Sequence, residues 1–535
     1  MSTTEAELTG TRRPFFRFWL PRLLGILLLI DLAFIWLIPV EGFEGGMRMV
    51  ATVGSLLGFY VLFSLWLFIF SGYRWKWRLG FFLLIPLVVV GTAVAFFQRV
   101  DFTGDMTPIP RFRWEESLGE RQANLQSHRE EQAKAGKASI SLVSQSDTDF
   151  PEYRGRKRDG VVAGASLSGF DKTKVHEIWR QPCGGGYSSF ALAGQGAVTI
   201  EQRGGEEVVA CYEAATGKEC WTYSYPAHFK ETMGGPGPRA TPTIADGDVY
   251  SLGAKGDLAR LDGATGKEKW KINILNNNDN IMWGMSGSPL VYDNVVVVNP
   301  GRQRESADGR AVVAYDRETG KEVWAAGSAQ AAYASPMLAT LAGRRQILIF
   351  DAVGLAGYDA VKGDELWRYE WKTANDINVA QPVVLPGDQV FITSGYWHGC
   401  AMLKVSEVNG QFSRAETWPN TPNRAMHCKF SNPVFYQGYL YGLDEGRLAC
   451  VDAAMGKRQW KEKDYGHGQL LLAGDKLVIL AETGELAIVA ADPKAFRELG
   501  KLKALKGEKT WNYPAMVGNR VFVRNHIEMA CYELE

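Results

Sequence analysis

An all-β, eight-bladed β-propeller preceded by an α-helical membrane anchor of three transmembrane helices is the fold that this 535-residue sequence predicts. Two observations carry the prediction. A ten-residue pattern ending in tryptophan recurs along the C-terminal part of the chain, and three long apolar runs stand before it. Self-similarity at a period of about 40 to 50 residues is typical of propellers. Apolar runs of about 20 residues are long enough to cross a bilayer.

The recurring pattern reads as a β-hairpin. It is YDRETGKEVW at 315–324, and it returns at 212–221, 261–270, 358–367 and 451–460. In each copy a glycine stands four residues before the tryptophan, and glycine readily takes the left-handed conformation that closes a hairpin loop. The tryptophan is a large apolar group at a fixed place, which predicts that it docks each sheet onto its neighbour.

The spacing of the tryptophans predicts eight blades. Trp179 and Trp418 keep the register of the five full copies, and Leu502 stands where an eighth, eroded copy is expected. The segment VHEIW at 175–179 has no three strands before it, whereas the C-terminus offers three strands without a fourth. We therefore expect VHEIW to pair with MACYEL at 529–534 and close the ring, because closure removes an exposed sheet edge.

The segment AYDRETGKEVW at 314–324 matches in full the tryptophan-docking motif A-x-D-x-x-T-G-K-x-x-W. The chain from 149 to 535 thus resembles the pyrroloquinoline-quinone-type (PQQ-type) β-propeller repeat family. The resemblance implies an architecture and not a chemistry. The family covers cofactor-using dehydrogenases as well as cofactor-free scaffold propellers, among them the lipoprotein that assists outer-membrane β-barrel assembly.

Composition and hydropathy divide the chain into three parts. With 59 basic and 59 acidic residues, no global charge favours nucleic acid as a partner. We expect a membrane anchor over 1–98, a polar and partly helical linker over 99–148, and the propeller over 149–535. Within the anchor, the expected transmembrane helices are those at about 23–40, 49–70 and 79–97.

Flanking charges predict the orientation of the anchor. Arginines cluster before the first apolar run, and Arg74, Lys76 and Arg78 stand between the second and third runs. By the positive-inside rule, the N-terminus is cytoplasmic and the propeller is periplasmic, which predicts a protein of the bacterial inner membrane with the lipid bilayer as a partner. Asp31 lies near the centre of the first run; an interhelical hydrogen bond and a proton or quinone site are both open for it.

The segment FPEYRGRKRDGV at 150–161 has two readings. Turn formers stand among Arg154, Arg156, Lys157 and Arg158, and the segment resembles the entry segment of such propellers. It is either a strap across one face of the ring or a basic contact for an anionic partner.

The position of each cysteine in the repeats predicts its role. Cys211, Cys450 and Cys531 stand where other copies have Ala314 or Gly357, so we expect them to be small buried residues. The other four, Cys183, Cys220, Cys400 and Cys428, are candidates for disulfide pairing.

Candidate ligand-binding residues stand where each repeat opens, because the innermost strand of a blade begins at the channel mouth. The polar outliers there are Arg239, His427, Lys429, His467, Trp511 and Asn512. A quinone cofactor with three carboxylates would need such cations, and an indole ring stacks on a flat ring system. Their alternative role is to satisfy loop backbone groups at a wet rim.

Two functions follow from these observations. The first is a binding scaffold of the cell envelope that recognises a protein, polymer or ligand. The alternative is a PQQ-dependent dehydrogenase, with calcium, that delivers electrons to the membrane quinone pool. A calcium quinoprotein needs clustered oxygen ligands and an aspartate base, whereas the repeat openings hold only Asp246 and Asp293, which are expected at turns. No catalytic or metal residue is therefore assigned, and fold alone does not choose between the functions.

Overall fold

A computed structural model describes residues 18–38, 45–134, 140–144, 146–167, 169–276, 278–301, 309–418, 425–507 and 509–534. The chain divides into two compact units, 1–117 and 118–535. Each unit is described by itself below.

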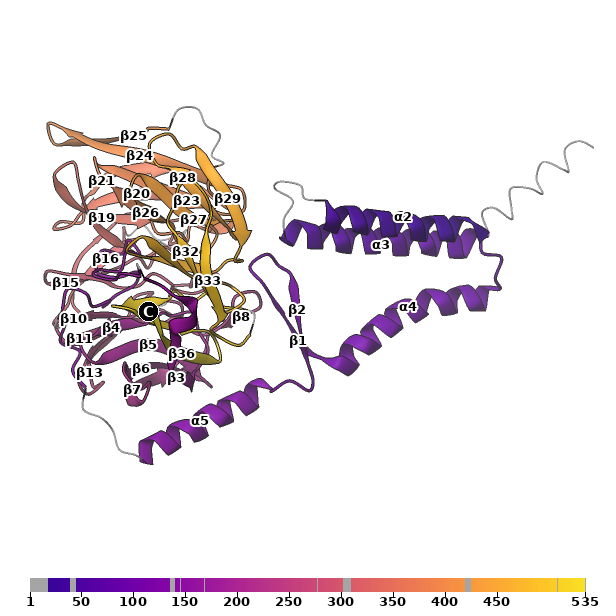
Figure 1. Ribbon diagram of the computed structural model, residues 1–535, viewed down its shortest axis with the longest axis horizontal. Coiled ribbons are helices and arrows are strands. Elements are labelled where there is room, and N and C mark those ends of the chain that lie inside the picture. Colours follow the sequence, from indigo (N-terminus) through magenta and orange to yellow (C-terminus); the bar gives the residue numbers. More distant parts are fainter. Residues whose placement is uncertain are drawn as a thin grey trace, which may run out of the picture. The chain divides into compact units, whose positions relative to one another are not determined.

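The first unit contains three apolar helices, α2 (Leu20–Leu37), α3 (Gly45–Ile69) and α4 (Trp75–Phe96) (Figure 1). All three are long and apolar enough to cross a membrane, as predicted. Asp31 lies on α2. On α3, the Tyr60 hydroxyl donates to the carbonyl of Phe82 and the Ser64 hydroxyl donates to the carbonyl of Tyr60. A short hairpin follows, made of β1 (Phe97–Phe102) and β2 (Pro108–Phe112), which the sequence analysis did not anticipate.

The second unit begins with the helix α5 (Leu118–Lys134), which packs on the propeller through polar side chains. Arg129 donates to the carbonyl of Pro182 at 2.6 Å, lies over the ring of Tyr212 and is 3.4 Å from the carboxylate of Glu219. The helix was expected within a solvated segment without an apolar face. The helix thus docks with one buried apolar side chain, Leu125, and with a buried guanidinium that is matched by a carbonyl, a ring and a carboxylate.

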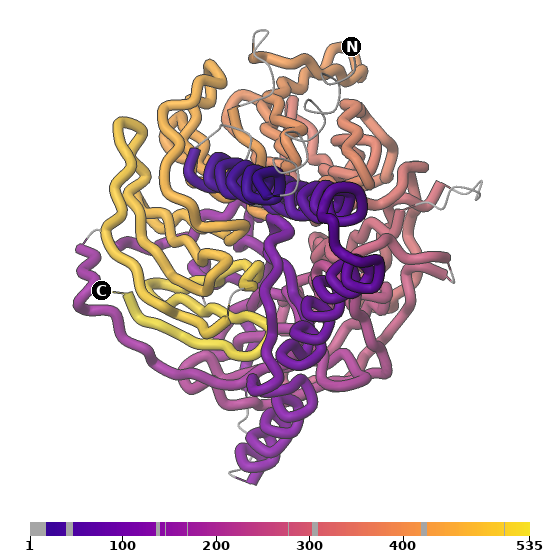
Figure 2. The backbone as a smooth tube through the Cα atoms, turned by 90° about the vertical axis from the view of Figure 1, so that its right-hand side faces the viewer, coloured from indigo at the N-terminus to yellow at the C-terminus, as the bar shows by residue number. Residues whose placement is uncertain are grey.

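The described residues of this unit form eight four-stranded antiparallel sheets, numbered here as blades 1 to 8. Figure 2 shows the blades following one another around a ring. Blade 1 contains β4 (Ala191–Ala193), β5 (Gly196–Arg203), β6 (Glu206–Glu213) and β7 (Glu219–Pro226), and blade 2 contains β10 (Thr243–Ala245), β11 (Asp248–Leu252), β12 (Asp257–Asp262) and β13 (Glu268–Asn273). Blade 3 contains β14 (Leu290–Tyr292), β15 (Val295–Val298), β16 (Val312–Asp316) and β17 (Glu322–Ala326). Blade 4 contains β18 (Met337–Leu341), β19 (Arg344–Phe350), β20 (Gly354–Asp359) and β21 (Glu365–Glu370).

Blade 5 contains β22 (Val383–Leu385), β23 (Gln389–Ser394), β24 (Gly399–Val408) and β25 (Gln411–Glu416). Blade 6 contains β26 (Val434–Tyr436), β27 (Tyr439–Asp444), β28 (Arg447–Asp452) and β29 (Arg458–Asp464). Blade 7 contains β30 (Gln469–Ala473), β31 (Lys476–Leu480), β32 (Glu485–Ala490) and β33 (Glu498–Lys503). A minor hairpin, β8 (Lys230–Glu231) with β9 (Gly235–Pro236), lies between blades 1 and 2. Two short 3-10 turns, η1 (Lys172–Lys174) and η2 (Ala374–Asp376), complete the unit.

Blade 8 joins the two ends of the propeller. Its order is β3 (Val175–Pro182), β36 (Glu528–Leu534), β35 (Arg520–Arg524) and β34 (Ala515–Val517). The pairing runs from Val175 opposite Leu534 to Pro182 opposite Glu528. The predicted closure of VHEIW on MACYEL is therefore confirmed.

The tryptophans dock the blades, as predicted. The indole N–H of Trp221 donates to the carbonyl of Gly263 in blade 2 at 2.8 Å, and its ring lies against Gly266, where an added Cβ would come within 2.4 Å of it. The same pairing with the next blade joins Trp179 to Gly217, Trp270 to Gly320, Trp324 to Gly363 and Trp418 to Gly456. The motif glycine is thus required twice, by its φ of about +70° and by the indole ring above it.

The core lies between the blades. Buried side chains of neighbouring blades share clusters; for example, Val198 of blade 1 packs with Val249 and Leu261 of blade 2. Cys211, Cys450 and Cys531 are fully buried in such clusters, as expected from their place in the repeat. All seven cysteines lie within the described residues and carry free thiols, including the four considered as candidates for pairing.

Candidate binding site at the channel mouth

The antiparallel order of each blade gives the channel two different ends. The link that enters the inner strand and the turn between the second and third strands lie at one end, which we call the mouth. The motif hairpin between the third and fourth strands lies at the other end. Asp246 and Asp293 are at turns between first and second strands, both with positive φ, so they lie at the end opposite the mouth, as expected for turn residues.

Residues 150–162 form a strap across the end opposite the mouth. Arg158 is 2% exposed; it forms an ion pair with Glu152 at 2.6 Å and donates to the carbonyls of Ser288 and Pro336 in blades 3 and 4. Arg154 is 1% exposed and donates to the carbonyl of Pro433 in blade 6. Both arginines thus have a structural role, because their guanidinium groups bind groups of the protein itself.

Backbone bonds tie the rest of the strap to the ring. The strap pairs with Leu192 of blade 1, Ile244 of blade 2 and Leu472 of blade 7. These contacts support the strap reading of the segment. Arg156 and Lys157 are exposed, so an anionic contact at this end would depend on these two cations.

Below the mouth, polar groups join each blade to the next in a closed belt. Its eight hydrogen bonds measure 2.5 to 3.4 Å and run from Ser189 to Thr241, Thr241 to Ser288, Ser288 to Ser335, Gln381 to Ser335, Gln381 to Asn432, Asn432 to Gln469, Gln469 to Trp511 and Ser189 to Tyr513. Buried polar groups are costly unless bonded, so the belt fixes the inner edges of all eight blades. The belt joins all eight blades below the mouth, and the strap spans the opposite end of the channel.

Three of the predicted site residues meet at the mouth. The Nζ of Lys429 lies 3.3 Å from Nε2 of His467. Glu482 links His467 to Trp511, because its carboxylate accepts the backbone N–H of His467 at 3.0 Å and the indole N–H of Trp511 at 2.7 Å. These residues come from the links into blades 6, 7 and 8.

Arg239 is connected to this group through an aromatic ring. Trp511 stacks on Tyr187 at 5.1 Å between centroids, and the guanidinium of Arg239 lies 5.5 Å from the centroid of Tyr187. Arg239 also donates to the carbonyl of Gly235 at 3.0 Å and approaches Glu231 at 3.4 Å. Burial lowers its pKa from the ordinary arginine value. It holds the β8–β9 hairpin in place.

The other two predicted residues are occupied by the fold. His427 lies 2.8 Å, through Nδ1, from the carboxylate of Asp444, which also binds Arg458. The pKa of Asp444 is lowered because the hydrogen bond and positive neighbours outweigh the cost of its burial. Asn512 is fully buried and donates to the carbonyl of Ser188 at 2.9 Å. Both residues support the loops beneath the mouth.

The residues that reach solvent at the mouth were missed by the sequence analysis. Tyr396 and Trp397 are 45% and 43% exposed and occupy the centre of a tight turn closed by a bond from His398 N–H to the carbonyl of Gly395. Both have positive φ, 57° and 54°. Such positions favour Asn and Gly, and a bulky residue there costs about 1 to 3 kcal/mol.

Contacts across the mouth hold this turn. Glu445 accepts the backbone N–H of Trp397 at 3.0 Å, and Lys429 lies over the ring of Tyr396 while pairing with Glu445 at 3.1 Å. Glu445 and Glu482 come from turns between second and third strands. These two residues were not predicted, because they lie outside the repeat openings, although LDEG at 443–446 and AETG at 481–484 share one place in the repeat.

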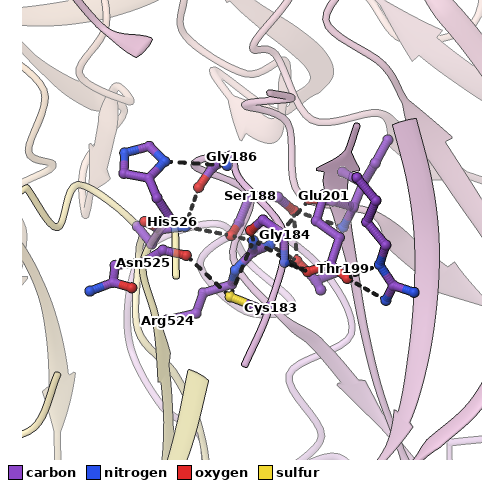
Figure 3. A network of polar contacts seen from close by, with 12 residues as sticks. Cys183, Gly184, Gly186, Ser188, Thr199, Glu201, Arg524, Asn525 and His526 are labelled. Atoms are coloured by element: carbon purple, nitrogen blue, oxygen red, sulfur yellow. Dashed lines mark hydrogen bonds and ion pairs between the residues drawn. The ribbon is translucent and has the colours of Figure 1, made fainter. Parts of the chain in front are cut away.

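A buried ion pair supports the mouth where blades 8 and 1 meet (Figure 3). Arg524 and Glu201 are both fully buried and 3.8 Å apart, and Arg524 donates to Thr199 at 2.6 Å and to the carbonyl of Gly184 at 2.9 Å. Burial alone would raise the pKa of Glu201. The positive charges of Arg203 and Arg524 outweigh it and hold the pKa at about 2.

The comparisons with known proteins agree with this architecture. The sequence profile of the family described as outer membrane protein assembly factor BamB matches residues 163–273 and 281–427. Over these residues, the propeller matches the PQQ-type β-propeller repeat family. A comparison with curated proteins finds no significant match.

Solved structures with similar folds are distant in sequence. The quinohemoprotein alcohol dehydrogenase from Comamonas testosteroni has 13% identity and a TM-score of 0.51, with 77% of this chain and 84% of that chain covered. BamB from Moraxella catarrhalis has 14% identity and a TM-score of 0.48, covering 67% and 97%. A europium-containing methanol dehydrogenase has 12% identity and a TM-score of 0.41, covering 76% and 100%. These likenesses concern the fold and assign no role.

The residues at the mouth do not fit PQQ. A cofactor with three carboxylates needs cations free to pair with it, whereas Arg239 is engaged by Glu231 and backbone carbonyls and Lys429 is engaged by Glu445. Calcium would need carboxylate ligands, but the carboxylate of Glu482 already accepts hydrogen bonds from Trp511 and His467. Arg239 and Lys429 are thus paired with carboxylates of the mouth itself, and aromatic side chains lie toward solvent.

Proposed function

We propose that the chain is a membrane-anchored recognition scaffold of the cell envelope, whose propeller binds a partner at the channel mouth. The observation that carries the proposal is the Tyr396–Trp397 turn, where two large aromatic side chains are held toward solvent in left-handed backbone. Strained backbone persists where function needs it, and exposed tryptophan and tyrosine are the residue types that dominate binding energy at interfaces.

Other apolar side chains stand in links at the same end of the ring. Met282, which is 66% exposed, and Trp283 stand in the link into blade 3, and Met233, 39% exposed, stands in the turn of the β8–β9 hairpin. Methionine adapts its shape to a partner and aromatic rings give it contact area. The strap across the opposite end of the channel favours binding at the face over passage through the channel. We propose a protein, or a polymer presenting apolar surface, as the partner.

Location is part of the proposal. The three apolar helices and their flanking charges support an anchor in the bacterial inner membrane, with a cytoplasmic N-terminus and a periplasmic propeller. Protease added to spheroplasts should digest the chain beyond about residue 98 and spare the loop at 72–78. Protection of the propeller from protease would contradict this orientation.

The binding role is tested by a photo-crosslinking amino acid placed at Trp397 in the full chain in living cells. Discrete adducts are expected at this position. The matched control is Val361, which is 75% exposed but lies at a motif hairpin, at the end opposite the mouth. Adducts of equal yield and identity at both positions, or none at Trp397, would count against the mouth as the binding site.

The quinone-dependent dehydrogenase is less well supported, because the cations that it requires are already paired. Reconstitution with PQQ and calcium distinguishes the two functions. Cofactor absorbance together with dye reduction would favour the enzyme over the scaffold.

A further inference from the structure

Two of the seven cysteines face each other across a β-bulge in blade 1. Cys211 on β6 is opposite Trp221 on β7, and the next pair along the strands is Tyr212 with Glu219. Cys220 is therefore the extra residue of the bulge. Because a bulge sets two residues against one, both Cys220 and Trp221 are opposed to Cys211.

The two thiols lie in the same buried cluster. Cys211 is 0% exposed and Cys220 is 3% exposed, and the cluster lies between blades 1 and 2. Opposed residues of an antiparallel pair have Cα atoms about 4.5 to 5.5 Å apart. Disulfides join residues whose Cα atoms are about 4.4 to 6.8 Å apart. A bond between Cys211 and Cys220 thus needs little movement of the backbone.

Other blades show that the pair is specific to blade 1. Cys450 and Cys531 occupy the same motif position and are opposite Trp460 and Trp179. The bulge residues there are Gln459 and Ile178. Among the described blades with a cysteine at this position, the bulge supplies a second thiol in blade 1 alone.

We propose that Cys211 and Cys220 form a disulfide bond under thiol-oxidising conditions, which fastens the bulge that positions Trp221 against blade 2. The indole of Trp221 lies on Gly266 and donates to the carbonyl of Gly263, so the bond would brace a docking contact. This inference is independent of the proposed function. It replaces the expectation that Cys211 is only a small buried residue.

The chemistry is an exchange with a disulfide donor such as oxidised glutathione. The hydrogen bond from its partner lowers the pKa of Cys220, whereas burial raises that of Cys211, so Cys220 is the attacking thiolate. It displaces one glutathione thiolate and forms a mixed disulfide. Cys211 then loses its proton and attacks the Cys220 sulfur, and the second glutathione leaves. One S–S bond is broken and one is formed, and two protons pass to the two glutathione thiolates.

The test uses the detergent-solubilised full chain, incubated with graded ratios of oxidised to reduced glutathione. A low concentration of urea is added so that local opening admits the reagent. After acid quenching, free thiols are alkylated in denaturant and the chain is digested with trypsin. Cleavage after Arg203, Lys218 and Lys230 separates the two cysteines into peptides 204–218 and 219–230. We expect these two peptides to be linked, with the other five cysteines alkylated.

Two variants sharpen the result. Cys220→Ser should leave Cys211 alkylatable at every ratio. Oxidation should raise the melting temperature of the unaltered chain by roughly 2 to 5 °C, and leave that of the variant unchanged. Gln459→Cys places a second thiol opposite Cys450, and the same geometry should yield a second linked pair in blade 6.

The proposal is overturned if Cys211 and Cys220 both remain alkylatable at the most oxidising ratio. It is equally overturned if the bond that forms joins other cysteines, such as Cys400 and Cys428, which share a cluster but have no bulge between them.

Discussion

The two ends of the propeller channel use the same residue types for different purposes. At the strap end, Arg154 and Arg158 are buried and bind carbonyl oxygens of inner strands. At the mouth, the charges of Lys429 and Glu445 hold a strained turn that presents Tyr396 and Trp397 to solvent. At the strap end the polar contacts hold the blades of the ring together, and at the mouth they hold a turn that presents aromatic side chains. The charge of a segment therefore does not reveal whether it binds a partner.

The strongest test of this contrast is Arg158→Ala at the strap. It leaves Glu152 buried without its partner and frees carbonyls of blades 3 and 4. The free energy of unfolding should fall by about 3 to 5 kcal/mol. Denaturant unfolding of the full chain, followed by tryptophan fluorescence, measures it. The control Arg156→Ala changes an exposed cation of the same strap and should cost about 0.5 kcal/mol or less. Equal losses in both variants would contradict the assigned roles.

Acid should weaken the support beneath the mouth through Glu201. Its pKa of about 2 lies below the value of about 4.3 for an unfolded glutamate. The stability that it contributes is therefore present above about pH 4.3 and is lost as pH falls toward 2. The full difference is about 3 kcal/mol. Glu201→Gln should remove this part of the pH dependence between pH 4.3 and 2, measured as the difference between the two unfolding curves. Parallel curves would show that Glu201 does not titrate as inferred.

Arg239→Ala separates a loop-holding role from a ligand-binding role. Because Arg239 donates to Gly235 and approaches Glu231, we expect a loss of about 1 to 3 kcal/mol in unfolding free energy. The control Lys230→Ala alters an exposed cation of the same link and should change stability little. A stable Arg239→Ala protein would restore the reading of this residue as a ligand cation.

The smallest expected change is a gain in stability, whereas the variants above are expected to lose stability. Trp397→Gly removes a bulky residue from left-handed backbone and keeps the N–H that Glu445 accepts. The unfolding free energy should rise by about 1 kcal/mol or less, while crosslinking from a photoreactive residue at Met282 should be lost. Val361→Gly, at an exposed position without positive φ, should instead cost about 0.5 to 1 kcal/mol. A destabilised Trp397→Gly protein would mean that the tryptophan is structural.

Repeating positions were predictable from the sequence because each repeat solves the same local problem. The motif glycines and tryptophans were assigned correctly, since a glycine at φ of about +70° under an indole leaves a signature in every copy. The closing pair β3 and β36 followed from counting strands. The candidate site was predicted only in part. Lys429, His467 and Trp511 do meet, but Asn512 and His427 are buried against backbone and Asp444, which no single repeat shows.

By itself, the sequence determined the eight-bladed ring, its closure and the three apolar helices, because periodicity and hydropathy are properties of local segments. Only the tertiary structure decided which charged side chains are exposed and which are buried against the ring. Arg158 and Arg156 stand two residues apart in one strap, and one is buried against blades 3 and 4 while the other is exposed. Likewise Glu445 and Trp397 lie 48 residues apart and meet at the mouth. Such contacts join separate blades, so their free energy depends on the closed ring, which no local pattern records.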